Sequence, residues 1–263
     1  PDKVYDAFNS DDATLMFVIF DTTTSADETM DAIQEIRAAG NAQCFVSGMS
    51  AIVTDTKNLS DKEVPIYVLI AVLLCIVVLS LTMNSWLVPF LFLASIGMSI
   101  IYNLGSNIFL GEISYITKAL TAVLQLGVTM DYSIFLWHSY QEQLVLFPGD
   151  RNEAMAHAIA ATLKSVVASS ITTIAGFIAL CFMSFTLGLD MGVVMAKGVV
   201  IGVICCVTVL PSLIMIFDRA LAKTHHRELI PDVPKITEFV TKHYKVFLVL
   251  FVILFLPAVY CQQ

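Results

Sequence analysis

Residues 66–104 read IYVLIAVLLCIVVLSLTMNSWLVPFLFLASIGMSIIYNL, and this stretch decides the class of fold. It contains no acidic or basic residue. A helix that crosses the hydrocarbon core of a bilayer needs about 20 apolar residues, and the polar pair Asn84-Ser85 divides the stretch into two segments of about that length. We therefore expect two membrane-spanning helices here, at about 66–83 and 86–104, joined by a tight turn.

The composition of the whole chain agrees with this expectation. Of its 263 residues 57% are apolar and 14% are charged, with a mean hydropathy of +0.81, whereas soluble domains are about half apolar and a quarter charged. One soluble core could not bury so much apolar surface, so a water-soluble globular enzyme is excluded. The net charge of −8 also excludes a nucleic-acid-binding protein, because there is no basic excess to pair with phosphate.

Four more segments are apolar enough to cross a membrane, the last one barely so. They lie at about 119–137, 166–185, 191–217 and 246–260. Backbone polar groups cannot be left unpaired in hydrocarbon, so these segments should be helices. The predicted fold class is a membrane all-α bundle of about six transmembrane helices, preceded by a small extracytoplasmic α+β segment.

Residues 1–64 differ from the rest of the chain, because they hold 12 of the 22 acidic residues and 4 of the 14 basic ones. Ser25 and Glu28 have the spacing of a capping box before a helix. The pattern predicts a strand, a helix, a second strand and an amphipathic stretch, at 13–21, 26–39, 42–46 and 52–59.

These patterns divide the chain into four parts. The boundaries are 1–64 for the acidic segment, 65–217 for a five-helix bundle, 218–245 for an amphipathic linker and 246–263 for the start of a further span. Because the sequence begins at Pro1 and ends just after an apolar run, we expect it to be a fragment of a longer protein.

The distribution of Lys and Arg predicts the orientation, since these residues concentrate in cytoplasmic loops. If residues 1–64 lie outside, only Lys118 falls in a short outer loop. The linker 218–245 is therefore predicted to be cytoplasmic and residues 1–64 extracytoplasmic. The inner loops then hold Arg151, Lys164, Arg219, Lys223, Arg227, Lys235, Lys242 and Lys245.

Two charged residues fall inside predicted spans, where a charge costs about 2.5–3.5 kcal/mol on insertion scales. Asp131 lies about twelve residues, or some 18 Å, into the third span. Lys197 lies about a third of the way into the fifth span, which runs in the same direction. Lys197 is therefore a candidate charge partner of Asp131, unless its long side chain simply reaches toward water.

Asp131 is followed by Tyr132 and preceded one turn earlier by Gly127, where a glycine lets a neighbouring helix come close. A carboxylate is poorly solvated in hydrocarbon, so such an acid can take up and release a proton, as a proton-driven carrier requires. The same residues would also suit a structural aspartate that is hydrogen-bonded to a tyrosine. At this point both interpretations stay open.

Small residues mark two further helix faces. Ser169, Thr173 and Gly176 share one face of the fourth span, and we interpret them as a packing surface near the Asp131–Tyr132 pair. A path for water or protons along these hydroxyls is the alternative. Two pairs of glycines four residues apart also predict close packing, Gly188/Gly192 and Gly198/Gly202.

No motif for covalent catalysis, phosphate binding or metal binding occurs in the sequence. Five of the six cysteines lie in apolar runs, which is typical of small buried hydrophobic residues. His225 and His226 lie in a charged stretch and are interpreted as solvated. We expect neither an enzyme nor a bound cofactor or metal.

The run GVTMDYSIFL, at residues 127–136, resembles the GxxxDY signature of the resistance-nodulation-division (RND) superfamily, and above all that of its MMPL branch. The stretches SSITTIAG at 169–176 and MAKGVVIG at 195–202 are similar to the next two helices of that family. The resemblance extends over nearly the whole chain. One departure is His138-Ser139, where many members have an arginine soon after the signature.

The resemblance implies the first half of an exporter in the bacterial inner membrane, driven by the proton gradient, with lipid-like or amphipathic substrates or drugs. Residues 1–64 would be the C-terminal part of a porter-type domain. Asp131 and Tyr132 would form half of a proton relay and would face a counterpart pair in the missing second half. The implied partners are membrane lipids, the substrate and that second half.

Two functions from other classes are also considered. One is a non-transporting lipid sensor that resembles sterol-sensing domains, and the other is a structural membrane scaffold in which Asp131 only holds helices together. An acid at depth, rather than a neutral polar residue, favours the transporter.

Overall fold

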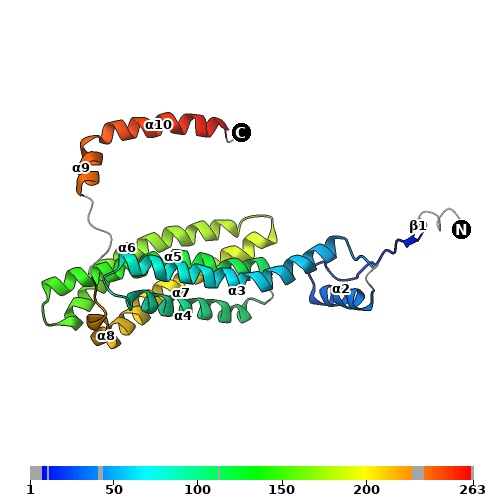
Figure 1. The fold of residues 1–263 in the computed structure, drawn as a ribbon, viewed down its shortest axis with the longest axis horizontal. Helices are drawn as coiled ribbons and strands as arrows, with labels where there is room; N and C mark the ends of the chain where they lie inside the picture. The colour runs from blue at the N-terminus through cyan, green and yellow to red at the C-terminus, as the bar shows by residue number, and fades with distance from the viewer. Residues whose placement is uncertain (1–7, 11, 41–43, 112, 227–233, 262–263) are drawn as a thin grey trace.

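A computed structural model describes residues 8–10, 12–40, 44–111, 113–226 and 234–261. It confirms a membrane all-α bundle, because these residues are almost entirely helical (Figure 1). Five of the described helices are long and apolar enough to cross a membrane. They are α3 (Met49–Thr82), α4 (Val88–Gly105), α5 (Tyr115–Leu146), α6 (Arg151–Leu180) and α7 (Thr186–Ile216).

Helix α7 is central to the bundle, since it packs against α4, α5 and α6, while α3 lies against α4 and α5. The side chains of Phe92, Leu136, Val199 and Leu210 lie between these helices with at most 1% of their surface exposed. Lipid tails are as apolar as these side chains, so close packing rather than exclusion from water holds such helices together.

The helices are longer than predicted and their connections shorter. The expected inner loop at 138–165 reduces to residues 147–150, because α5 and α6 both continue as helices beyond the predicted spans. The Asp150 carboxylate accepts hydrogen bonds from the N–H groups of Asn152 and Glu153, which caps α6 at that turn. Likewise, α3 runs without a break through Pro65, so the amphipathic stretch at 52–59 and the first span are one helix.

The N-terminal segment contains less regular structure than predicted. The helix is confirmed as α2 (Asp27–Ala39), but Ala26 precedes it and no side chain caps it, so the capping box is wrong. The predicted strand at 13–21 is present only as β2 (Ala13–Thr14), which pairs antiparallel with β1 (Asn9–Ser10). The Leu15 N–H still donates to the Phe8 carbonyl oxygen at 2.7 Å, but residues 16–20 have no strand beside them in the described chain. Of the second predicted strand, residues 44–46 are not a strand and 42–43 lie outside the described residues.

Helix α2 packs on the first turns of α3. Met30 and Ile33 of α2 and Ala51 of α3 are each at most 5% exposed. On the surface, Arg37 forms an ion pair with Asp55, and the Lys57 ammonium lies 2.8 Å from the Asp27 carboxylate. The hydrogen bond and charge of Lys57 lower the pKa of Asp27. Two ion pairs thus flank a small apolar contact between the two helices.

After α7, the chain forms α8 (Asp218–Lys223) and then returns to the turn between α3 and α4. The His226 N–H donates to the Asn84 carbonyl oxygen at 2.9 Å, and the Trp86 N–H donates to the Thr224 carbonyl oxygen at 3.3 Å. The rings of Trp86 and His226 stack with their centroids 4.7 Å apart. We call residues 84–86 and 224–226 the linker anchor.

The linker anchor corrects the interpretation of His226 as a solvated residue. Its side chain is half-buried, and its ring nitrogen Nε2 lies 3.1 Å from the Ser80 carbonyl oxygen. The charged stretch around His226 does not indicate that the turn between α3 and α4 lies beside it. This turn provides carbonyl oxygens and the Trp86 indole ring as partners. His225, in contrast, is exposed as expected.

The last described helices are α9 (Pro234–Lys242) and α10 (Tyr244–Cys261). Helix α9 lies within the stretch predicted to be amphipathic, and α10 is a shorter apolar helix at the place of the sixth predicted span. Figure 1 shows both of them apart from the five-helix bundle.

Candidate functional site

Asp131 lies on the outside of the bundle, about sixteen residues and roughly 24 Å along α5 from its first residue. Its side chain is exposed, as are those of Phe135 and His138 on the same side of the helix. Among the described residues no side chain forms a hydrogen bond or ion pair with its carboxylate. The acid therefore faces away from the helices of this chain.

Tyr132 points in a different direction from Asp131, because successive residues of a helix are about 100° apart. Only 3% of its surface is exposed, and its hydroxyl has no hydrogen-bond partner among the described residues. The two residues of the signature are thus neighbours in sequence, one at the bundle surface and one in the core.

Lys197 is not brought to Asp131. Its ammonium Nζ bonds to the Asn103 carbonyl oxygen at 3.0 Å, the Ser106 hydroxyl at 2.8 Å and the Asn107 amide oxygen at 2.5 Å. The next residue, Gly198, packs at the level of Gln125, and Asp131 lies about six residues, or roughly 9 Å, further along α5. Lys197 is therefore not a charge partner of Asp131. Its ammonium instead donates hydrogen bonds at the C-terminal end of α4.

The small residues predicted to pack near Asp131 do not pack against other helices in the described part of the chain. Apart from the adjacent residues and the backbone of its own helix, no described heavy atom lies within 4 Å of where a Cβ of Gly127 or Gly176 would be. Ser169 is exposed, and the Thr173 hydroxyl donates to the Ser169 carbonyl oxygen of its own helix at 3.1 Å. Spacing along a helix identifies residues that share a face, but it does not show what covers that face.

The glycine pairs of α7, in contrast, are close contacts as predicted. A Cβ at Gly202 would overlap the Thr129 side chain, and one at Gly198 would lie 2.5 Å from the Asn103 amide nitrogen. Gly192 and Gly188 similarly face backbone atoms of the α6 end, at 2.6 and 2.9 Å. These glycines allow α7 to approach α4, α5 and α6 closely.

Two buried amides, those of Asn103 and Gln125, join α4, α5 and α7. The Asn103 Nδ2 donates to Gln125 Oε1 at 2.9 Å and to the Val194 carbonyl oxygen at 3.3 Å. The Gln125 Nε2 donates to Ser99 Oγ at 2.7 Å and to the Gly198 carbonyl oxygen at 3.2 Å. We call Ser99, Asn103 and Gln125 the amide clasp. An Asn or Gln in an apolar span predicts a hydrogen bond between helices, since its amide must find partners inside the bundle.

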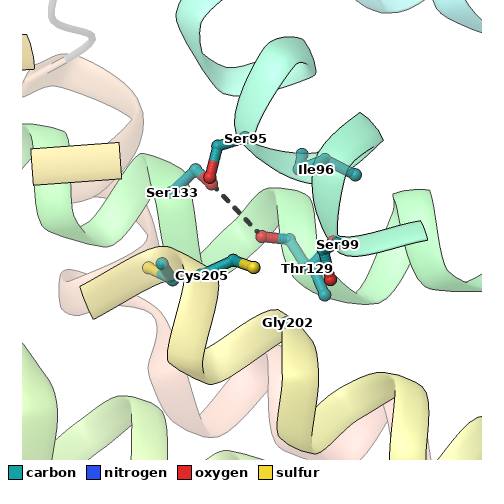
Figure 2. Close-up of a pocket in the computed structure, with 8 residues that line it drawn as sticks. Ser95, Ile96, Ser99, Thr129, Ser133, Gly202 and Cys205 are labelled. Atoms are coloured by element: carbon teal, nitrogen blue, oxygen red, sulfur yellow. Dashed lines mark hydrogen bonds between the residues drawn. The ribbon is translucent and has the colours of Figure 1, made fainter. Parts of the chain in front are cut away.

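A line of hydroxyl groups continues from the amide clasp between the same three helices. Figure 2 shows Ser95, Ser99, Thr129 and Ser133 around a small space that Gly202 and Cys205 close from the α7 side. The Ser133 hydroxyl donates to the Thr129 carbonyl oxygen at 3.4 Å. This polar line lies on the side of α5 opposite to Asp131, because Thr129 and Ser133 are each two residues away from it on the helix.

Membership of a family follows from comparison with known proteins. A family model described as the MMPL family matches residues 4–241. The chain belongs to the MMPL family. The match includes all five spans together with the outward-facing Asp131 and the buried Tyr132.

This MMPL chain is similar to several curated membrane proteins. It is 30% identical over 205 residues to the putative membrane protein ActII-3 of Streptomyces coelicolor, covering 74% of the chain and 28% of that protein. It is 27% identical over 203 residues to the siderophore exporter MmpL5 of Mycobacterium tuberculosis, covering 74% and 21%. It is 22% identical over 198 residues to the heme uptake protein MmpL11 of M. tuberculosis, covering 70% and 20%.

The MMPL chain therefore spans less than a third of the length of these relatives, at 28%, 21% and 20%. The family match and the apolar helices establish that the chain is part of a membrane protein of the MMPL family. In the described residues no group of three or more His, Cys, Asp or Glu side chains could hold a metal ion.

Proposed function

We propose that this chain is the first half of a proton-driven exporter of the RND/MMPL type and that its substrates are lipid-like or amphipathic molecules or drugs. Asp131 and Tyr132 form half of the proton relay in this proposal. The other half is a matching pair in a second membrane half of the same protein.

The outward-facing carboxylate of Asp131 carries this proposal. A charge that faces lipid at this depth is costly, so such residues are usually turned toward a partner or a water-filled path. The adjacent Gly127 leaves an open position one turn away on the same helix, where a further helix can approach closely. A helix of the second half that packs here would enclose the acid and supply groups that exchange its proton.

Tyr132 supplies the second part of the relay. Its buried hydroxyl has no partner among the described residues, which is an unfavourable arrangement for a purely structural group. A rotation of this side chain toward Asp131 would join the hydroxyl to the path of the proton. The proposal therefore assigns proton uptake to Asp131 and a change of hydrogen-bond partner to Tyr132.

The location and domain division belong to the same proposal. The Lys and Arg residues favour an orientation with residues 1–64 extracytoplasmic and 218–245 cytoplasmic, and the family supports a location in a bacterial inner membrane. Residues 1–64 then belong to a porter-type domain, 65–217 to the first transmembrane bundle and 246–263 to a further span. Helix α3 connects the first two parts directly, since it continues from Met49 to Thr82.

The relatives differ in the direction of transport that their names give, so the direction for this chain is part of the proposal. MmpL5 is named a siderophore exporter and MmpL11 a heme uptake protein. We propose export of lipid-like or amphipathic molecules, with membrane lipids as neighbours of the bundle.

The test is the substitution Asp131→Asn in a full-length protein that contains this chain, reconstituted in liposomes with an imposed pH gradient. We expect proton-dependent substrate movement to fall to background while the protein still folds. The matched control is Asp190→Asn, because the Asp190 carboxylate accepts a hydrogen bond from the Ser114 N–H and an amide oxygen can do the same. Full transport by the Asp131→Asn protein would exclude the relay, whereas a parent protein that moves no substrate in the pH gradient would favour the lipid sensor or the scaffold.

A further inference from the structure

The ammonium group of Lys197 lies in a cage of three oxygen atoms at one end of α4. They are the carbonyl oxygen of Asn103, in the last turn of that helix, and the side-chain oxygens of Ser106 and Asn107, in the 3-10 helix η1 (Ser106–Phe109) that follows. The distances are 3.0, 2.8 and 2.5 Å. Three residues within five positions of one segment thus converge on a single cation.

The cage matches the chemistry of an ammonium ion. Lysine has three N–H donors and no acceptor, so three oxygens satisfy the group completely. The last carbonyl groups of a helix have no partner within the helix and carry its partial negative charge, which favours a cation at this place. Among the described residues no carboxylate forms an ion pair with Lys197.

We propose that the Asn103 carbonyl, the Ser106 hydroxyl and the Asn107 amide oxygen form a binding site for a small ammonium ion, and that Lys197 fills this site from α7. The site takes primary ammonium ions, which can donate three hydrogen bonds. Its occupation ties the end of α4 and the η1 turn to α7. This inference concerns the cage alone and is independent of the proton relay.

The position of the cage explains why this tie matters for the bundle. Gly198, which follows Lys197, packs against the amide clasp, and Asn103 belongs to both the cage and the clasp. The ammonium therefore holds the C-terminal end of α4 in place. At this end the Asn103 side chain is hydrogen-bonded to Gln125. Loss of the ammonium should loosen α4, α5 and α7 at one common point.

The test compares two neutral variants of the full-length protein by their thermal unfolding midpoints. Lys197→Ala empties the cage, whereas Lys197→Met loses the charge but keeps a side chain of similar length in the space. Both should unfold several degrees below the parent. Added methylammonium should raise the midpoint of Lys197→Ala and leave that of Lys197→Met unchanged. Tetramethylammonium, which has no N–H donor, should raise neither.

Equal effects of methylammonium on both variants, or equal effects of the two ions on Lys197→Ala, would overturn the proposal. A second variant covers the case in which Lys197→Ala fails to fold. Asn107→Asp places a carboxylate beside the ammonium, so it should raise the midpoint of the parent and lower that of Lys197→Met, where the acid has no cation. The same direction of change in both backgrounds would also contradict the cage. Neither result depends on whether Asp131 carries protons.

Discussion

At the level of single residues, direction on the helix separates Asp131 from Tyr132. The acid is exposed on the outside of α5, while the tyrosine is 3% exposed and its hydroxyl lacks a partner among the described residues. A buried polar group without a hydrogen bond costs about 1–3 kcal/mol. The sequence motif DY therefore joins two groups with different environments, and each can be tested by itself.

Replacing Tyr132 by Phe should leave the fold intact or stabilise it. The substitution removes the unpaired hydroxyl and keeps the ring, so the free energy of unfolding should rise by up to about 1–3 kcal/mol. In the proposed relay the same change should reduce proton-dependent transport. The measurements are the thermal unfolding midpoint and transport in liposomes. A lower midpoint would show that the hydroxyl makes a structural hydrogen bond.

Replacing Gly202 by Ala should destabilise the bundle. Its new methyl group would overlap the Thr129 side chain, and overpacking of this kind costs about 1–3 kcal/mol. Gly176→Ala is the matched control, because a Cβ there would meet no described atom outside its own helix within 4 Å and alanine favours the helix. We expect a lower unfolding midpoint for Gly202→Ala alone. Equal midpoints for the two variants would contradict the close approach of α7 to α5.

At the level of elements, the linker anchor joins parts of the chain that are far apart in sequence. Residues 224–226 after α8 lie along the turn between α3 and α4, with an antiparallel bridge between Ser85 and His225. The Ser85 and Thr224 hydroxyls lie 2.8 Å apart. On the other side of the turn, the Trp137 indole N–H of α5 donates to Asn84 Oδ1 at 3.2 Å. The short turn thus positions both α5 and the segment after α8.

Replacing His226 by Ala should release this segment from the turn. The change removes the ring stack with Trp86 and the contact with the Ser80 carbonyl oxygen. An aromatic pair contributes about 0.5–1.5 kcal/mol, so hydrogen exchange of the amides at 84–86 and 224–226 should become roughly two- to tenfold faster. His225→Ala is the control, since its side chain is exposed and should change nothing. Similar exchange rates in both variants would contradict the anchor.

At the level of the whole molecule, the described helices of the bundle do not cover the side of α5 that carries Asp131. Phe135 on α5 is 57% exposed, and it lies one turn beyond Asp131. The chain spans 20–28% of the three relatives described above. In the proposed transporter a second half covers this side and turns an exposed acid into an enclosed one.

Tryptophan probes can test whether this side is covered in a full-length protein. Phe135→Trp should be shielded from quenching by lipids with brominated acyl chains, because the proposed second half packs over it. Leu74→Trp on α3 is the control, since Leu74 is 60% exposed in the bundle and should face lipid. Fluorescence of the native Trp86 and Trp137 is subtracted in both cases. Equal quenching of the two probes would contradict a cover over Asp131.

The helices could be predicted from the sequence better than the strands. Each predicted span coincides with a helix, because in hydrocarbon a backbone can pair its polar groups only within itself or in a closed barrel. The predicted strand at 13–21 is mostly absent from the structure, since a strand depends on a neighbour that local sequence does not specify. The Gly198/Gly202 contacts could also be predicted, because two glycines four residues apart in an apolar helix usually allow a neighbouring helix to pack closely.

The sequence by itself determined that this is a membrane bundle, where its spans lie and that an acid is placed deep within one of them. These properties follow from apolar length and from the cost of charge in hydrocarbon, which are local. Only the tertiary structure decided that Asp131 faces outward, that Lys197 binds the end of α4 and that His226 stacks on Trp86. Those facts depend on how helices rotate and pack against each other, and periodicity along one helix does not specify its neighbours.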